Sequence, residues 1–295
     1  LTQVSKKIAY LQELLMLNLW NNRLSSLPNA MARLDKLQTL VLSDNHFEEL
    51  PAAVCALEGL EHLYITSNAL RSLPAAIGQL GALQTLDLWG NALETLPEET
   101  TQLHNLTDLY LNNNKLDALP ATMGRLSKLQ RLYAGQNNIR ALPGSVGKLV
   151  QLEGLVLTGN ALTHLPESIL QLGKLKNLEL AQNALETIPA GLLGLPQLEA
   201  LDISGNALTA LPVTQGAGPL LDLNLSGNQL SSLPGAFSGF AQLEYLDLSD
   251  NQFSEIPEVL YRMPGLASLN LEGNPLPESQ VRKLRRALPG AAVRF

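Results

Sequence analysis

Aromatic side chains recur in this sequence at places suited to contact with another protein. Tyr64, Tyr110 and Tyr133 and the two tryptophans, Trp20 and Trp89, stand at matching places in a pattern that repeats every 23 residues. Binding sites concentrate exposed tyrosine and tryptophan, because these side chains offer a large contact area for little lost entropy. Aromatic residues also suit β-strands, where they pack on one another. We favour a binding patch, because the buried positions of the pattern are leucine.

Carboxylates gather at equivalent positions in the second half of the chain. They are Glu153, Glu179, Glu199, Asp202, Asp222, Glu244, Asp247, Asp250 and Glu272. We expect Lys176 to be the only cation among them. Neighbours such as Glu179 and Asp202 repel each other unless a basic partner or an ion relieves them, although solvation alone also makes this repulsion tolerable.

The two halves together predict a partner with apolar or aromatic anchors at one end and Lys or Arg side chains at the other. The candidate partner-binding residues are Trp20, Tyr64, Asp87, Trp89, Asp108, Tyr110, Arg131, Tyr133, Glu179, Asp202 and Asp247.

The repeat that positions these residues reads L-x-x-L-x-L-x-x-N-x-L and is clearest from Leu83 to Leu93. Its asparagine is found at Asn22, Asn45, Asn68, Asn91, Asn114, Asn137, Asn160, Asn183, Asn206, Asn228, Asn251 and Asn274. These twelve repeats are spaced by 23 residues, apart from one step of 22 between Asn206 and Asn228. A period of this length is typical of a solenoid, in which only stacking of repeats makes a core.

Each part of the repeat has a predicted structural role. The last two leucines of L-x-x-L-x-L are two residues apart, so a strand points both inward and its intervening residues outward. The asparagine carboxamide can satisfy buried backbone groups in its own coil and the next one. A following Leu-Pro, as at Leu27-Pro28, predicts an extended turn.

The fold class is therefore an α/β repeat solenoid, a horseshoe with a parallel β-sheet on its concave face and short helices or irregular turns on its convex face. Residues 1–13 are predicted to be a partial N-terminal repeat or cap, and we expect the parent protein to continue upstream. Residues 14–276 form the solenoid of twelve repeats, and residues 277–295 form a C-terminal capping helix and terminal strand. Glycine and proline at 212–219 predict a loop there.

Nothing in the sequence indicates catalysis. The four histidines lie on different repeats. His62 and Asp108, two strands apart on one face, could form an acid-base pair, but we interpret them as ordinary surface residues. No cofactor motif and no metal-ligand spacing are present, so no cofactor is predicted. Cys55 is the single cysteine and is predicted to be packed in the core, so a disulfide within the chain is impossible and a cytoplasmic location is favoured.

Charge and hydropathy narrow the classes of partner. The formal net charge of −7 disfavours nucleic acid, and no apolar run is long enough for membrane insertion. The expected partner is a protein bound on the concave face, and we expect the chain to be monomeric in isolation.

The unit with L-P-x-x-I, clearest at residues 73–80, resembles the intracellular class of leucine-rich repeats. That class includes Ras-group scaffold proteins and many bacterial proteins, among them secreted effectors, and the chain's ending at 284–295 looks like the bacterial members. The resemblance implies protein recognition on the concave face, with any enzymatic activity in a separate domain.

Three readings of function stay open. The first is a protein-protein interaction module or scaffold, and the second is the substrate-recognition domain of a larger enzyme, such as a bacterial effector ubiquitin ligase or a kinase. The third, carbohydrate or small-ligand binding by the aromatic residues, would show as affinity for free sugars.

Overall fold

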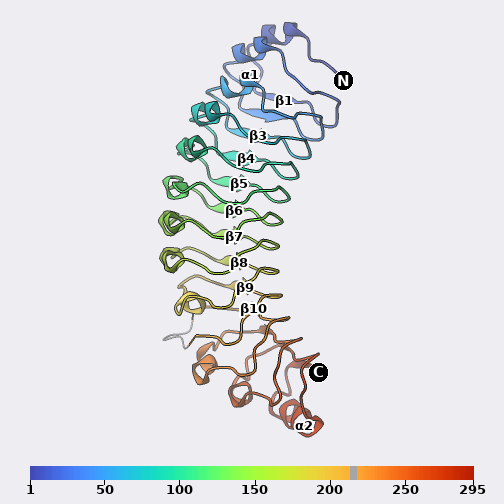
Figure 1. The fold of residues 1–295 in the computed structure, drawn as a ribbon, viewed down its shortest axis with the longest axis vertical. Helices are drawn as coiled ribbons and strands as arrows, with labels where there is room; N and C mark the ends of the chain where they lie inside the picture. The colour runs from blue at the N-terminus through green and yellow to red at the C-terminus, as the bar shows by residue number, and fades with distance from the viewer. Residues whose placement is uncertain (213–217) are drawn as a thin grey trace. The chain divides into compact units, whose positions relative to one another are not determined.

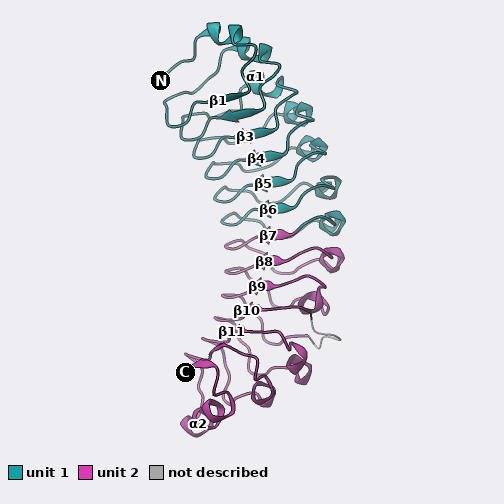
Figure 2. Cartoon of the chain, turned by 180° about the vertical axis from the view of Figure 1, so that it is seen from behind, with its two compact units in different colours: residues 1–152 teal, residues 153–295 magenta. Residues whose placement is uncertain are grey.

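The computed structural model describes residues 1–212 and 218–295. They divide into two compact units, residues 1–152 and 153–295 (Figure 2). Within each unit, three-residue strands succeed one another on one side, and short helical turns connect them on the other (Figure 1). The loop predicted at 212–219 falls mainly on residues outside the described ranges.

Unit 1 contains six parallel strands among its described residues, in chain order. They are β1 Met16–Asn18, β2 Thr39–Val41, β3 His62–Tyr64, β4 Thr85–Asp87, β5 Asp108–Tyr110 and β6 Arg131–Tyr133. Its helical turns are η1 Lys6–Tyr10, η2 Asn29–Arg33, α1 Ala52–Cys55, η3 Ala75–Gln79, η4 Glu98–Gln102, η5 Met123–Arg125 and η6 Gly144–Lys148. All are single 3-10 turns except α1, which is one α-helical turn.

Unit 2 has the same organisation and ends in a longer helix. Its described strands are β7 Gly154–Val156, β8 Asn177–Glu179, β9 Ala200–Asp202, β10 Asp222–Asn224, β11 Tyr245–Asp247, β12 Ser268–Asn270 and β13 Ala292–Arg294. Its described helices are η7 Glu167–Gln171, η8 Leu192–Gly194, η9 Gly235–Gly239, η10 Glu258–Arg262 and α2 Glu278–Ala287. The predicted repeat solenoid with a parallel sheet is confirmed.

The middle residue of each strand points into the core, and the residues on either side of it point out. Leu86 and Leu109, at the centres of β4 and β5, are fully buried, as are the leucines that directly follow these strands, Leu88 and Leu111. We call the opposite side of the sheet, formed by the first and last residues of each strand and the second residue after it, the open sheet face. Function can be encoded there because the core does not use it.

An asparagine that is buried or half-buried closes each coil. In the coil of β5, the Asn114 amide donates to the carbonyl of Leu111 at 2.9 Å and to that of Leu88 at 3.0 Å. Its side-chain oxygen accepts the N–H of Leu93 at 3.0 Å. Leu88 and Leu93 belong to the preceding coil. The prediction that the carboxamide bonds to the next coil is therefore wrong, because Asn114 bonds to the coil before it. We call the column of these residues the asparagine ladder.

The residue just before every ladder asparagine has a positive φ, between 51° and 74°. Glycine occupies five of these positions, as at Gly90, while Asn, Asp, Ser and Gln occupy the others. This left-handed residue turns the chain out of the strand, so that the following asparagine can point inward.

Proline begins most of the helical turns on the far side of each coil. Pro28, Pro74 and Pro97 have φ near −70° and ψ between 139° and 150°, and each directly precedes a 3-10 turn. The prediction that Leu-Pro marks an extended turn is confirmed.

The helix α2 packs on the last coil of unit 2. Leu284 and Leu288 of this segment are buried, and the side chain of Gln280 accepts the N–H of Ile256 at 2.7 Å. Lys283 lies over the ring of Tyr261 at 4.7 Å. The predicted boundaries of the solenoid with its N-terminal cap, at 13/14, and with its C-terminal cap, at 276/277, remain predictions.

We predict that Asn114→Ala lowers the free energy of unfolding by about 2–3 kcal/mol, because it leaves buried backbone groups without partners. Chemical denaturation measures this change. The control is Asn138→Ala, whose exposed amide makes only one long bond, at 3.4 Å, and which should change stability by less than about 0.5 kcal/mol. Equal effects of the two substitutions would contradict the role of the ladder.

Candidate functional site

Unit 1 aligns aromatic side chains along its open sheet face. The register pairs Tyr64 with Asp87, Asp87 with Tyr110, and Tyr110 with Tyr133, on strands β3 to β6. The rings of Tyr110 and Tyr133 meet edge to face, with centroids 5.3 Å apart and planes at 73°. Trp89, two residues beyond Asp87, is 45% exposed. We call Tyr64, Trp89, Tyr110 and Tyr133 the aromatic patch.

Asp87 lies within this patch. One oxygen of its carboxylate accepts the backbone N–H of Trp89 at 3.1 Å. Burial raises the pKa of the Asp87 carboxyl, and the Trp89 N–H offsets part of that effect. The tyrosines on the neighbouring strands and the following tryptophan therefore surround a partly desolvated carboxylate.

Asp108 and Arg131 form an ion pair at the start of strands β5 and β6. The Asp108 side chain is nearly buried, while that of Arg131 is half exposed. Asp108 also accepts the Thr107 hydroxyl at 2.8 Å and lies 3.5 Å from the hydroxyl of Tyr110. The hydrogen bond to Asp108 raises the pKa of Arg131, and burial and then Asp108 raise the pKa of Tyr110. The sequence indicated both charged residues as partner contacts, but not their pairing.

Two other residues of unit 1 find partners that the sequence did not indicate. His62 contacts the hydroxyl of Thr85 at 3.1 Å, on the strand between it and Asp108. Trp20 is 56% exposed, and its indole N–H donates to Asp44 of the second coil. Trp20 therefore stands at the β1–β2 end of the face, away from the strands that carry the aromatic patch.

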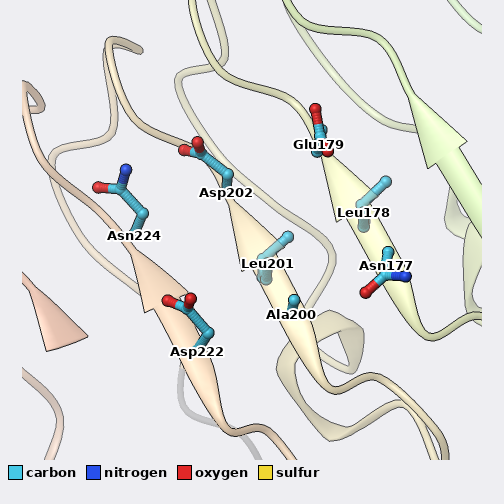
Figure 3. Close-up of a pocket in the computed structure, with 8 residues that line it drawn as sticks. All are labelled: Asn177, Leu178, Glu179, Ala200, Leu201, Asp202, Asp222 and Asn224. Carbon is cyan, nitrogen blue, oxygen red and sulfur yellow. The ribbon is translucent and has the colours of Figure 1, made fainter. Parts of the chain in front are cut away.

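Unit 2 presents a hollow of about 270 Å³ on its open sheet face. Figure 3 shows the small side chain of Ala200 between the longer ones of Asn177 and Asp222, which leaves the space open. The residues that line the hollow are Asn177, Leu178, Glu179, Ala200, Leu201, Asp202, Asp222 and Asn224. The sequence-predicted Glu179 and Asp202 thus come together, with Asp222 beside them. We call these three the acidic cluster.

The carboxylates of the acidic cluster repel one another. Burial and then the charge of Asp202 raise the pKa of Glu179. Burial raises the pKa of Asp222, with further contributions from Asp202 and Asp247. Asp247 itself is held in place, because it accepts the N–H of Ser249 at 2.8 Å and the Asn270 amide at 3.1 Å.

The prediction that Lys176 is the only cation on this face is wrong. Arg294 pairs in register with Asn270, because β13 adds to β12, and it lines a second hollow together with Asp222 and Asp247. This arginine was missed because a terminal strand outside the repeat pattern carries it. Lys176 forms an ion pair with Glu153 at 2.9 Å.

The described residues show no sign of a metal site, a reactive thiol or a membrane-spanning helix. No group of three or more His, Cys, Asp or Glu side chains in these ranges is arranged to hold a metal ion. Cys55 is buried, and burial raises the pKa of its thiol, as expected of a packing residue. In the described part of the chain, no helix combines the length and the apolar character that a membrane crossing requires.

We predict that Asp222→Asn raises stability at pH 7 and that this gain fades as the pH falls towards 4. A carboxyl whose pKa is raised by folding destabilises the folded state while it is charged, and protonation removes that penalty. Denaturation midpoints at both pH values test this. Glu186→Gln, exposed and outside the lining of the hollow, is the control. A gain that persisted unchanged at pH 4 would contradict the explanation.

Comparisons with known proteins agree with this geometry. A family model described as a leucine rich repeat matches residues 36–93, 150–208 and 219–276, and one described as a leucine-rich repeat region matches residues 65–137. The comparison with curated proteins gave no match.

Solved structures resemble the chain over nearly its whole length. A leucine-rich repeat protein of Leptospira interrogans is 31% identical, with a TM-score of 0.81 over 100% of this chain and 81% of that one. The leucine-rich repeat ectodomain of the Arabidopsis thaliana receptor kinase GASSHO1/SCHENGEN3, solved with CASPARIAN STRIP INTEGRITY FACTOR 2, is 30% identical, with a TM-score of 0.80. That match covers 99% of this chain and 37% of the ectodomain.

A third similar structure is the Drosophila Toll–Spatzle complex, at 25% identity and a TM-score of 0.78. It covers 96% of this chain and 40% of the matched chain, so this chain spans less than half of the matched chain in both the Arabidopsis and the Drosophila structures. The family models cover more than half of the residues, and the match to the bacterial structure covers all of this chain. The chain belongs to the leucine-rich repeat family.

Proposed function

We propose that this chain is a protein-protein interaction module that binds a protein partner on its open sheet face, the face expected to be concave. The observation that carries the proposal is the aromatic patch. Four large aromatic side chains stand on a face that the core does not use, and Trp89 is 45% exposed. Aromatic residues of this kind dominate the binding energy of many interfaces.

Structures that resemble the chain support the general class of function. The Arabidopsis ectodomain was solved with CASPARIAN STRIP INTEGRITY FACTOR 2, and the Drosophila structure is a complex of Toll with Spatzle. Leucine-rich repeat proteins are thus often protein-binding modules, and the repeat usually serves as a non-catalytic scaffold. That this chain binds a protein partner, and which of its residues contact that partner, is what we propose.

The acidic cluster supplies the second part of the proposed surface. Glu179, Asp202 and Asp222 surround the hollow, and Asp247 follows on β11. A partner with Lys or Arg side chains would relieve their mutual repulsion and would be attracted from a distance. We therefore propose apolar or aromatic contacts at unit 1 and basic contacts at unit 2.

A second candidate is the substrate-recognition domain of a larger enzyme whose catalysis lies outside this chain. The Arabidopsis match supports one part of this reading, the joining of a leucine-rich repeat domain to an enzyme, since the matched ectodomain belongs to a receptor kinase. For either candidate we propose a cytoplasmic location, which the single buried cysteine supports.

We predict that the double variant Trp89→Ala and Tyr110→Ala weakens partner binding by more than about 2 kcal/mol, because both side chains are interface anchors. Pull-down from a native cell lysate with mass spectrometry identifies proteins that only the wild type retains. Titration calorimetry with the identified partner then measures the loss.

The matched control for this experiment is Tyr10→Ala, which removes an 80% exposed aromatic side chain located in η1, away from the open sheet face. Circular dichroism checks that each variant is folded. Identical protein lists for the wild type and the folded double variant would exclude the aromatic patch as the binding site.

We predict that Asp202→Asn with Asp247→Asn slows association with the partner and reduces the salt dependence of the association rate. Both substitutions remove charge while keeping an oxygen for local hydrogen bonds. Stopped-flow measurements at several salt concentrations provide the rates. Glu167→Gln with Glu186→Gln removes the same charge from exposed turns and is the control. A wild-type rate that does not depend on salt would argue against the acidic cluster.

A further inference from the structure

The aromatic patch contains one carboxylate, Asp87, that pairs with no cation in the described part of the chain. The one described hydrogen bond of this carboxylate is to the backbone N–H of Trp89, through Oδ1, and the described residues show no hydrogen bond to its second oxygen, Oδ2. The neighbouring Asp108 differs, because Arg131 neutralises it.

The position of Asp87 places aromatic rings around its charge. Tyr64 and Tyr110 are its register partners on either side, about 4.8 Å away along the sheet. Trp89 follows on the same strand and is the most exposed of the four rings in the patch. The faces of such rings are negative, so the rings and the carboxylate attract the same kind of group.

An apolar side chain of a partner would offer the Asp87 carboxylate neither a hydrogen bond nor a charge partner. Covering Asp87 with an apolar side chain would complete the desolvation of a carboxylate that burial already disfavours, and that loss opposes binding. A cation gains from the same burial, because it pairs with the carboxylate and lies against the rings. Arg131 does not repel such a cation strongly, because its own charge is paired with Asp108.

We infer that the aromatic patch binds an arginine side chain of the protein partner, with the guanidinium stacked on Trp89 or a tyrosine and donating to Asp87. Arginine fits better than lysine because its planar group stacks on aromatic rings and also offers paired donors to a carboxylate. This inference rests on the proposed function and adds one cation to the apolar or aromatic contacts proposed for unit 1.

Short blocked peptides test the inference without knowledge of the partner. Protein labelled with ¹⁵N-tryptophan gives one indole signal for each of its two tryptophans, and the Trp89→Phe spectrum identifies the signal of Trp89. The labelled protein is titrated with acetyl-Gly-Xaa-Gly-amide, where Xaa is arginine, citrulline, lysine or phenylalanine. Citrulline keeps the shape of arginine and lacks its charge.

We expect the arginine peptide to shift the Trp89 signal with a millimolar dissociation constant, and the citrulline peptide to bind at least about tenfold more weakly. Lysine should bind several-fold more weakly than arginine. Asp87→Asn, which keeps the acceptor for the Trp89 N–H, should abolish the preference for arginine over citrulline. Asp117→Asn, an exposed carboxylate off the patch, should leave that preference intact.

Several results would overturn the inference. Equal binding of arginine and citrulline, or an arginine preference that survives Asp87→Asn, would show that charge recognition by Asp87 is absent. Equal binding of lysine would overturn the choice of arginine. Tighter binding of the phenylalanine peptide would refute the inference while supporting the proposed function, since the patch would then take apolar anchors. No shift with any peptide would also refute it, and the pull-down with the Trp89 and Tyr110 variant would decide the proposed function separately.

Discussion

The structure depends on the hydrogen bonds that the carboxamide of each ladder asparagine makes to backbone groups. Each coil turns sharply after its strand, and the turn buries backbone groups that no sheet or helix can satisfy. A side chain with both donor and acceptor solves this problem, as Asn114 does with two carbonyls and one N–H. Because the same bonds join neighbouring coils, the ladder also sets the distance and register between successive strands.

That register gives the open sheet face its chemistry. Strands that pair residue for residue place equivalent positions of successive repeats side by side, so Tyr110 meets Tyr133 and Asp108 meets Arg131. A change at one position therefore acts on its neighbours 23 residues before and after it. The same rule brings Glu179 beside Asp202, where repulsion accumulates, and sets Asp87 between two tyrosines.

The period of the repeat predicts the strands, the buried leucines and the Leu-Pro turns, because each follows from local geometry and the need to bury apolar surface. Other features depend on contacts that the period does not encode. The left-handed residue before each asparagine is Gly90 in one coil and Gln136 in another, so no single residue type reveals it. The bond of Trp20 to Asp44 and the place of Arg294 depend on side-chain reach and on a strand outside the repeat.

The direction of the asparagine ladder has a consequence for how the protein is made. Within each unit, carboxamides find partners in their own coil and in the one before it, as Asn251 does with the carbonyls of Leu248 and Leu225. A ribosome releases the chain from its N-terminus, so the earlier coil is already outside when the later one emerges. Every new carboxamide donor can thus be satisfied as soon as it is synthesised. The N–H groups of the same turn are satisfied later, when the following coil emerges, as the N–H of Leu93 is by Asn114.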